Sequence, residues 1–140
     1  MNDEHLDLDR LQSRILQAPY HRWLGLQLLG VGEDSIEIKA SWREEWVVSV
    51  ERRYTHGGII AALIDLAADW ALAGKLGRAV PTIDTRVDYH KAAMPGDLTA
   101  KGKVIRLGNQ FSVCEASVFD QDGQLCASGR GTYFTAPPRA

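Results

Sequence analysis

The stretch HGGIIAALIDLAADWALAGKL, from His56 to Leu76, decides the fold of this chain. At 3.6 residues per turn it makes a helix of about six turns, and Gly74 and Gly77 fit a C-terminal stop. Apolar residues occupy nearly every side of this helix, so other structure must wrap it. Asp65 and Asp69 argue against a membrane span, because each would cost roughly 2.5–3.5 kcal/mol at a bilayer centre. We therefore predict a long buried helix in a soluble domain.

The segments on both sides of this helix predict one antiparallel sheet. Before the helix we expect a first helix over 6–17 that ends before Pro19, strands over 24–31 and 35–42, and a loop with a short strand or helical turn over 44–55. After it we expect strands over 82–89, 98–107, 111–119 and 124–135, the last three joined by tight turns. This order predicts an α+β fold in which the sheet wraps around the central helix. Residues 1–140 are expected to form a single domain, with 1–23 as N-terminal helix and lead-in.

Composition and charge narrow the function. The chain has 140 residues, with 16 Lys and Arg against 18 Asp and Glu and a net charge of −2. No basic excess offers nucleic acid or an anionic membrane a footprint, so neither partner is expected. The acidic opening MNDEHLDLDR is unlike a signal peptide, which favours a cytoplasmic protein. Cys114 and Cys126 are expected to be buried thiols, and the four scattered histidines suggest no metal site.

The two glycines at the helix start are candidates for binding an oxygen atom. The first N–H groups of a helix have no partner within the helix, and its dipole adds partial positive charge at that end. Without side chains at Gly57 and Gly58, a carbonyl oxygen that becomes negative during a reaction can approach these amides. The alternative is that the glycines only let the helix start pack tightly against a strand. The helix start alone does not decide between the two.

Asp65 is the second candidate, because it lies on a helix otherwise built of Ala, Ile and Leu. An isolated buried carboxylate is costly unless a donor reaches it, and functional sites tolerate that cost more readily than other places. The alternative is that Asp65 lines a solvated seam. Asp69, one turn further on, either faces a similar seam or lies near the open end of the helix.

A distance estimate links the two candidates. Gly57 and Asp65 are eight residues apart, or about 12 Å along a helix. One small carbonyl group cannot touch both groups of the same helix. Two antiparallel helices side by side would bring Gly57 of each chain near Asp65 of the other. If both groups are catalytic, we expect at least a two-fold dimer with two equivalent sites, and pairing of dimers into tetramers is the further expectation.

These residues also carry a resemblance to a known family. The HGG motif with Asp65 nine residues after His56, together with the later segments, resembles the hotdog-fold acyl-CoA thioesterases of the PaaI type. The likeness covers roughly residues 24–134. The later segments that match are TIDTRVDYHK at 82–91, MPGD at 94–97, DGQ at 122–124 and ASGRGT at 127–132.

The resemblance implies roles for individual residues. Asp65 matches the family's catalytic carboxylate, which acts as nucleophile or as general base on water. Gly57, with Gly58 as a second candidate, matches the amides that polarise the thioester carbonyl. Thr82 falls where similar enzymes keep a hydroxyl that helps to place the water. His56 matches the motif histidine, whose role is more often structural than acid–base.

The sequence departs from the family pattern in two places. The family usually has an Asn or Gln several residues before the histidine, whereas this chain has SVERR at 49–53. Either Glu51 takes that place or the thioester is oriented differently. In addition, Lys91 is followed by two alanines where the family usually has proline.

The implied function is hydrolysis of an aromatic or medium-chain acyl-CoA to free acid and CoA, without a cofactor or metal. Candidates for contact with the CoA phosphates are Arg106, Asn109 and Arg130, and candidates for the acyl pocket are Trp42, Trp46 and Trp70. Two alternatives stay open. One is a hotdog hydratase or dehydratase that pairs His56 with Asp65 of another chain, and the other is a non-catalytic acyl-CoA-binding module.

Overall fold

The computed structural model describes residues 3–137, with side chains from Leu8 onward. Its elements follow in chain order: α1 (Asp3–Ile15), α2 (Pro19–Trp23), β1 (Gln27–Val31), β2 (Ser35–Ala40), the 3-10 turn η1 (Glu44–Trp46), α3 (Gly57–Leu76), β3 (Thr82–Tyr89), β4 (Leu98–Arg106), β5 (Phe111–Phe119) and β6 (Leu125–Phe134). None of the helices in this part of the chain is long and apolar enough to cross a membrane.

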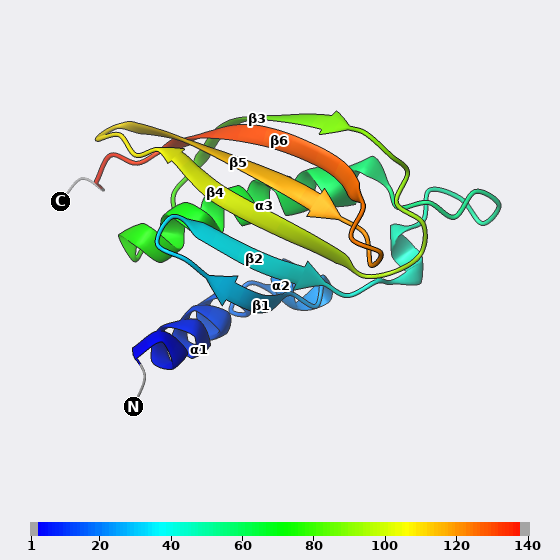
Figure 1. Cartoon of the computed structure of the whole chain (residues 1–140), viewed down its shortest axis with the longest axis horizontal. Helices are drawn as coiled ribbons and strands as arrows, with labels where there is room; N and C mark the ends of the chain where they lie inside the picture. Colours follow the sequence, from blue (N-terminus) through cyan, green and yellow to red (C-terminus); the bar gives the residue numbers. More distant parts are fainter. Residues whose placement is uncertain (1–2, 138–140) are drawn as a thin grey trace.

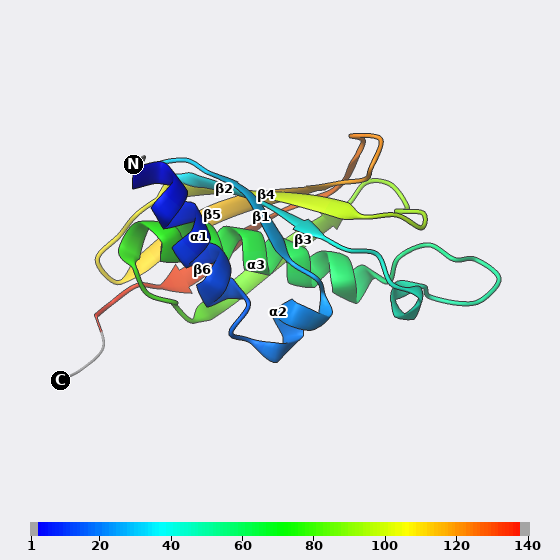
Figure 2. The same ribbon diagram turned by 90° about the horizontal axis from the view of Figure 1, so that it is seen from below.

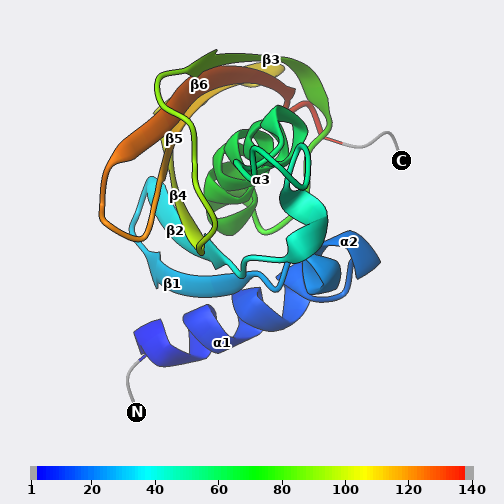
Figure 3. The same cartoon turned by 90° about the vertical axis from the view of Figure 1, so that its right-hand side faces the viewer.

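The six strands form one antiparallel sheet in the order β1-β2-β4-β5-β6-β3. The sheet curves around α3, which lies along its concave side (Figure 1; Figure 3). The buried side of α3 presents Ile60, Leu63, Ile64, Ala67 and Leu72 to the sheet. The predicted α+β architecture, an antiparallel sheet around a long central helix, is therefore confirmed.

Glycines on the sheet let α3 approach closely. A Cβ atom on Gly102 of β4 would collide with the carbonyl group of Ala67, and a Cβ on Gly129 of β6 would lie 2.8 Å from the Ile64 side chain. At Gly102 the helix backbone around Ala67 therefore comes into contact with β4, and at Gly129 the Ile64 side chain fills the space that a Cβ atom would need. This close packing fixes which side chains of α3 meet which strand.

The wrapping of α3 is incomplete. The apolar side chains of Ile59, Leu66 and Trp70 pack against the core but are only partly buried. Seen along the helix, α3 is covered by the sheet on one side and remains open on another (Figure 3). The sequence led us to expect full burial, so this side of the helix is available to further structure.

The two edges of the sheet differ in how they are protected. At the β1 edge, the Gln12 side chain of α1 accepts the N–H of Leu28 at 2.5 Å and donates to the carbonyl of Leu26 at 3.1 Å. Helix α1 thus covers that edge with a side chain that imitates a strand partner, and Figure 2 shows it beside β1. Strand β3 forms the other edge and, within residues 3–137, pairs with β6 alone. Unpaired edge groups of this kind can pair with another chain.

Several predicted boundaries needed correction. Pro19 does not merely stop a helix, because it begins α2, as proline can occupy the first helical turn without losing a hydrogen bond. Gly77 ends α3 in a left-handed conformation with φ of 75°, whereas Gly74 lies inside the helix. The first helix begins earlier than predicted, at Asp3, and the side chain of Leu6 lies outside the described residues. The uncertain segment 44–55 contains η1 and an isolated bridge between Val47 and Thr55, as expected.

Candidate active site

Three hydroxyl groups converge on one oxygen of Asp65. Its Oδ1 atom accepts hydrogen bonds from Thr82 Oγ1 at 2.9 Å, from Tyr133 Oη at 3.0 Å and from Thr85 Oγ1 at 3.4 Å. Donors of this kind offset the cost of placing a carboxylate on an apolar helix. From the sequence we expected a hydrogen-bond donor to reach Asp65. Three hydroxyl groups from β3 and β6 do so.

A β-bulge explains how both threonines reach the same carboxylate. Side chains alternate along a strand, so residues 82 and 85 would normally point to opposite faces. The register of β3 against β6 shifts by one residue between Thr82 and Asp84, which places one extra residue, Ile83, in β3. A bulge reverses the alternation beyond it. Thr82 and Thr85 consequently both face α3, opposite Tyr133 and Gly131.

The second carboxylate oxygen is left open. No described residue donates to Asp65 Oδ2, and this atom is not among the buried polar atoms without a partner. Oδ2 is therefore accessible, whereas Oδ1 is held by hydroxyl groups. A carboxylate in this arrangement can attack a carbonyl carbon or take a proton from water with one defined oxygen.

At the start of α3, the backbone amides of Gly57 and Gly58 differ in their hydrogen bonding. His56 is the N-cap of α3, and its Nδ1 atom accepts the N–H of Gly58 at 3.2 Å. In the part of the chain that is described, no group accepts the N–H of Gly57. Tyr89 at the end of β3 donates its hydroxyl to the Gly57 carbonyl at 2.8 Å and so holds this residue from the other side. Of the two predicted amides, that of Gly57 remains available to a ligand oxygen.

Asp69 forms a second, more buried carboxyl group one turn along α3. Its pKa is raised to about 7, first by burial and second by the negative charge of Asp65, while the backbone N–H of Val80 opposes both effects. Its Oδ1 atom is buried without a partner. Burial also raises the pKa of the neighbouring Cys114 thiol to about 12, to which the charge of Asp69 contributes. At neutral pH a large fraction of the protein molecules therefore carries a protonated Asp69.

The other predicted site residues lie away from Asp65 within the chain. Glu51 is exposed in the loop bounded by the Val47–Thr55 bridge. Arg106 is exposed at the end of β4, and Asn109 is exposed in the turn that follows. Arg130 pairs with Glu115 at 3.4 Å. These four assignments stay predictions.

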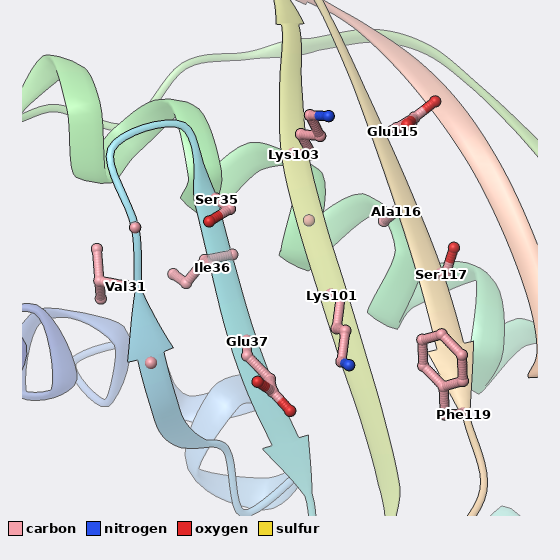
Figure 4. A pocket seen from close by; sticks show the side chains of 13 residues that line it. Val31, Ser35, Ile36, Glu37, Lys101, Lys103, Glu115, Ala116, Ser117 and Phe119 are labelled. Carbon is pink, nitrogen blue, oxygen red and sulfur yellow. The ribbon is translucent and has the colours of Figure 1, made fainter. Parts of the chain in front are cut away.

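Glu115 belongs to the outer face of the sheet. Figure 4 shows it with Lys101, Lys103 and Phe119 on the side of the strands turned away from α3. A shallow groove of about 480 Å³ crosses this face. Asp65 lies on the helix side of the sheet, so the groove is separate from its carboxylate. Arg130 lies on the groove side, where it forms an ion pair with Glu115.

The tryptophans proposed for the acyl pocket differ in burial. Trp46 is fully buried in the core, whereas Trp42 and Trp70 are partly exposed. Cys114 and Cys126 are free and buried, as predicted. Within residues 3–137, no group of three or more His, Cys, Asp or Glu side chains is arranged to hold a metal ion.

Sequence reasoning missed three residues of this site. Tyr133 and Thr85 contact the carboxylate, and Tyr89 contacts the helix start. Each is a polar residue at an inward position of a strand, a pattern that could have indicated them. The bulge in β3 was not predicted from the sequence, so the placement of Thr82 and Thr85 on the same face of the strand was not foreseen.

Comparison with known proteins identifies relatives along most of the chain. The medium/long-chain acyl-CoA thioesterase YigI of Salmonella typhimurium is 27% identical over 136 residues, which cover 86% of this chain and 87% of that protein. An X-ray structure of a protein from the thioesterase superfamily is 47% identical, with a TM-score of 0.89, and the match covers 92% of this chain and 98% of that one. The Escherichia coli PaaI protein from the phenylacetic acid degradation operon shares the fold, with a TM-score of 0.76 at 18% identity over 96% of this chain and 99% of that one.

The family itself is defined by a match of the thioesterase superfamily sequence model to residues 53–127, more than half of the chain. The matched segment runs from the loop before His56 through α3 to the start of β6, and so includes the glycine pair and Asp65. The predicted resemblance and the predicted enzyme class, a thioester hydrolase, are confirmed at this level. With the sheet, the helix and these relatives in agreement, the chain belongs to the thioesterase superfamily.

Proposed function

We propose that this protein hydrolyses acyl-CoA thioesters to a free acid and CoA. The observation that carries the proposal is that α3 holds both an open helix-start amide, at Gly57, and a carboxylate whose Oδ2 atom is open, at Asp65. The name of YigI supports a medium-chain or long-chain acyl group. The family resemblance implied an aromatic or medium-chain acyl group.

The chemistry follows from the two groups. The Gly57 N–H donates to the thioester carbonyl and stabilises the negative charge that develops on its oxygen, and one such donor is typically worth about 10²–10³ in rate. Oδ2 of Asp65 either attacks the carbonyl carbon or removes a proton from the attacking water. If Oδ2 attacks, the C–S bond breaks as an acyl–Asp65 anhydride forms, and water then hydrolyses this anhydride to the free acid and the carboxylate. If Oδ2 activates water, the water oxygen adds to the carbonyl carbon and the C–S bond breaks to give the free acid. In both routes the CoA thiolate takes up a proton that the water supplies and leaves as the thiol. Thr82, predicted to place the water, contacts the carboxylate itself.

The site requires two chains. Gly57 and Asp65 lie on the same helix, about 12 Å apart along its axis, so a single thioester group meets both only if they come from different copies. Two observations favour an antiparallel pairing of the chains. The β3 edge is open, with Ile83 exposed to 56%, and the uncovered side of α3 carries partly buried apolar residues. We propose a two-fold homodimer, and pairing of such dimers remains the further prediction.

A thiol-release assay across short, medium, long and aromatic acyl-CoAs tests the proposal. Asp65→Asn keeps the shape of the side chain and removes the base, so we expect the rate to fall about 100-fold or more. Asp122→Asn makes the same change at an exposed turn and serves as the matched control.

The outcomes separate the alternatives. Near-normal hydrolysis by Asp65→Asn rules out the assignment of the carboxylate. Acyl-CoA binding in calorimetry without thiol release over hours indicates a binding module. A changed double bond with intact thioester indicates a hydratase or dehydratase.

A further inference from the structure

We propose that Tyr133 is a positioning residue that fixes Asp65 Oδ1 and thereby makes Oδ2 the reacting oxygen. This inference rests on the proposed function, because it assigns a role within the same site. Tyr133 lies on β6, outside the helix that carries the glycines and the carboxylate, and neither the sequence pattern nor the comparisons assign it a role.

The hydroxyl of Tyr133 shares its single hydrogen between two acceptors of Asp65, one carboxylate oxygen and the backbone carbonyl oxygen. It lies 3.0 Å from Asp65 Oδ1 and 3.3 Å from the backbone carbonyl oxygen of the same residue. One donor therefore links the Asp65 side chain to the turn of α3 that carries it. The phenol is fully buried, with 0% exposure, so packing also limits its own movement.

Gly131 makes room for this contact. A Cβ atom at Gly131 would lie 2.5 Å from Tyr133 Oη and 2.7 Å from its Cε2. The ring thus lies over the glycine two residues before it on the same face of β6, and a larger residue there would push the hydroxyl away from Asp65. Thr85 pairs with Gly131 in the register of β3 and β6, which places the third donor beside the same gap.

Tyr133 remains a donor under working conditions. Burial raises the pKa of its hydroxyl, and the nearby Asp65, Asp69 and Cys114 raise it further. A phenol that keeps its proton donates a hydrogen bond and does not accept the proton that the reaction moves.

The consequence concerns the two carboxylate oxygens. A carbonyl-type oxygen has two lone pairs in its plane, and three hydroxyl groups already compete for those of Oδ1. Oδ1 is therefore occupied and less nucleophilic, whereas Oδ2 is accessible. Free rotation of the carboxylate would exchange the two atoms, and the Tyr133 contact opposes that rotation.

Tyr133→Phe removes the hydroxyl and keeps the ring. We expect kcat to fall about 10- to 100-fold with KM nearly unchanged, as for a lost hydrogen bond to a charged group that orients the reacting atom. Tyr20→Phe, at an exposed tyrosine of α2, is the matched control and is expected to leave both constants unchanged. Gly131→Ala is the second variant, since it keeps Tyr133 but displaces its hydroxyl, and a similar fall in kcat is expected.

A second readout does not depend on hydrolysis. At fixed pH, the ¹³C signal of the Asp65 carboxyl group should move in Tyr133→Phe and stay in place in Tyr20→Phe. If the wild-type protein releases no thiol, the proposed function fails, while this signal still tests the contact.

Two results overturn the inference: an unchanged kcat in folded Tyr133→Phe, whether or not KM rises, or an unmoved Asp65 signal. If Tyr133→Phe does not fold, wild-type kcat in Gly131→Ala overturns it in the same way.

Discussion

The Nδ1 atom of His56 lies 3.2 Å from the backbone nitrogen of Gly58 and accepts its N–H group. An accepting Nδ1 carries no proton, so the neutral ring holds its proton on Nε2. This contact divides the two glycines of the HGG motif between two tasks. The N–H of Gly58 is bound by the N-cap side chain, whereas no described group accepts the N–H of Gly57. The structural role expected for the motif histidine is consistent with this arrangement.

Loss of the cap should lower stability. In His56→Ala the Gly58 N–H loses its acceptor, and we expect the free energy of unfolding to fall by about 1 kcal/mol. His56→Asn offers a new side-chain acceptor at the same position and should recover most of the loss. Urea unfolding of the three proteins at one pH measures the difference. Equal stability of the Ala and Asn variants would show that the cap contributes little.

Substitution of the glycines should affect activity unequally. A Cβ atom at Gly57 would lie 3.3 Å from Tyr89 Oη, which is a tight contact, whereas one at Gly58 would be in ordinary contact with His56. A methyl group at Gly57 also narrows the approach to its amide. We expect Gly57→Ala to lower kcat/KM at least about 10-fold, towards the loss of a full oxyanion donor, and Gly58→Ala to lower it less. The reverse order in the thiol-release assay would assign the oxyanion amide to Gly58.

The fold could be predicted from the sequence because the apolar pattern is unambiguous. The continuous apolar surface of 57–76 requires a surrounding sheet, and the turn residues between β4, β5 and β6 set their hairpins. The short helix α2 was missed because proline at 19 was interpreted only as a helix stop. Local patterns of this kind predict the existence of an element better than its ends.

The site could be predicted only in part, because the hydrogen-bond donors around Asp65 are placed by the register in which β3 pairs with β6. Asp65 and Gly57 stand out on the helix from composition alone. The hydroxyl groups around Asp65 depend on the bulge at Ile83 and on the gap at Gly131, both of which follow from strand pairing. A one-residue shift moves a side chain to the other face of a sheet, and a single sequence does not reveal such a shift.

Asp69 should make stability depend on pH. An aspartate in an unfolded chain loses its proton near pH 4, whereas Asp69 in the folded protein keeps it up to about pH 7. Between these values the unfolded chain releases a proton that the folded protein holds, so stability falls as the pH rises. The loss amounts to at most about 4 kcal/mol and is complete above the folded pKa.

The variant Asp69→Asn removes this titration and keeps the size of the side chain. We expect wild-type stability to fall relative to Asp69→Asn between pH 4 and pH 8, measured by urea unfolding at several pH values. Asp122→Asn, at an exposed turn, controls for loss of an aspartate as such. Parallel curves for wild type and Asp69→Asn would show that Asp69 is ionised in the folded protein throughout this range.

The open β3 edge should be required for activity. Ile83 is the bulged residue of this edge and is exposed to 56%. A charge on an edge strand opposes pairing with another chain, so Ile83→Lys should produce a monomer in light-scattering measurements of molar mass. In the proposed dimer each site takes Gly57 from one chain and Asp65 from the other. Thiol release should therefore fall with the dimer fraction and recover at high protein concentration. Ile105→Lys introduces the same charge at an exposed isoleucine of β4 and should leave the dimer intact. A monomeric Ile83→Lys variant with wild-type activity would mean that one chain holds a complete site.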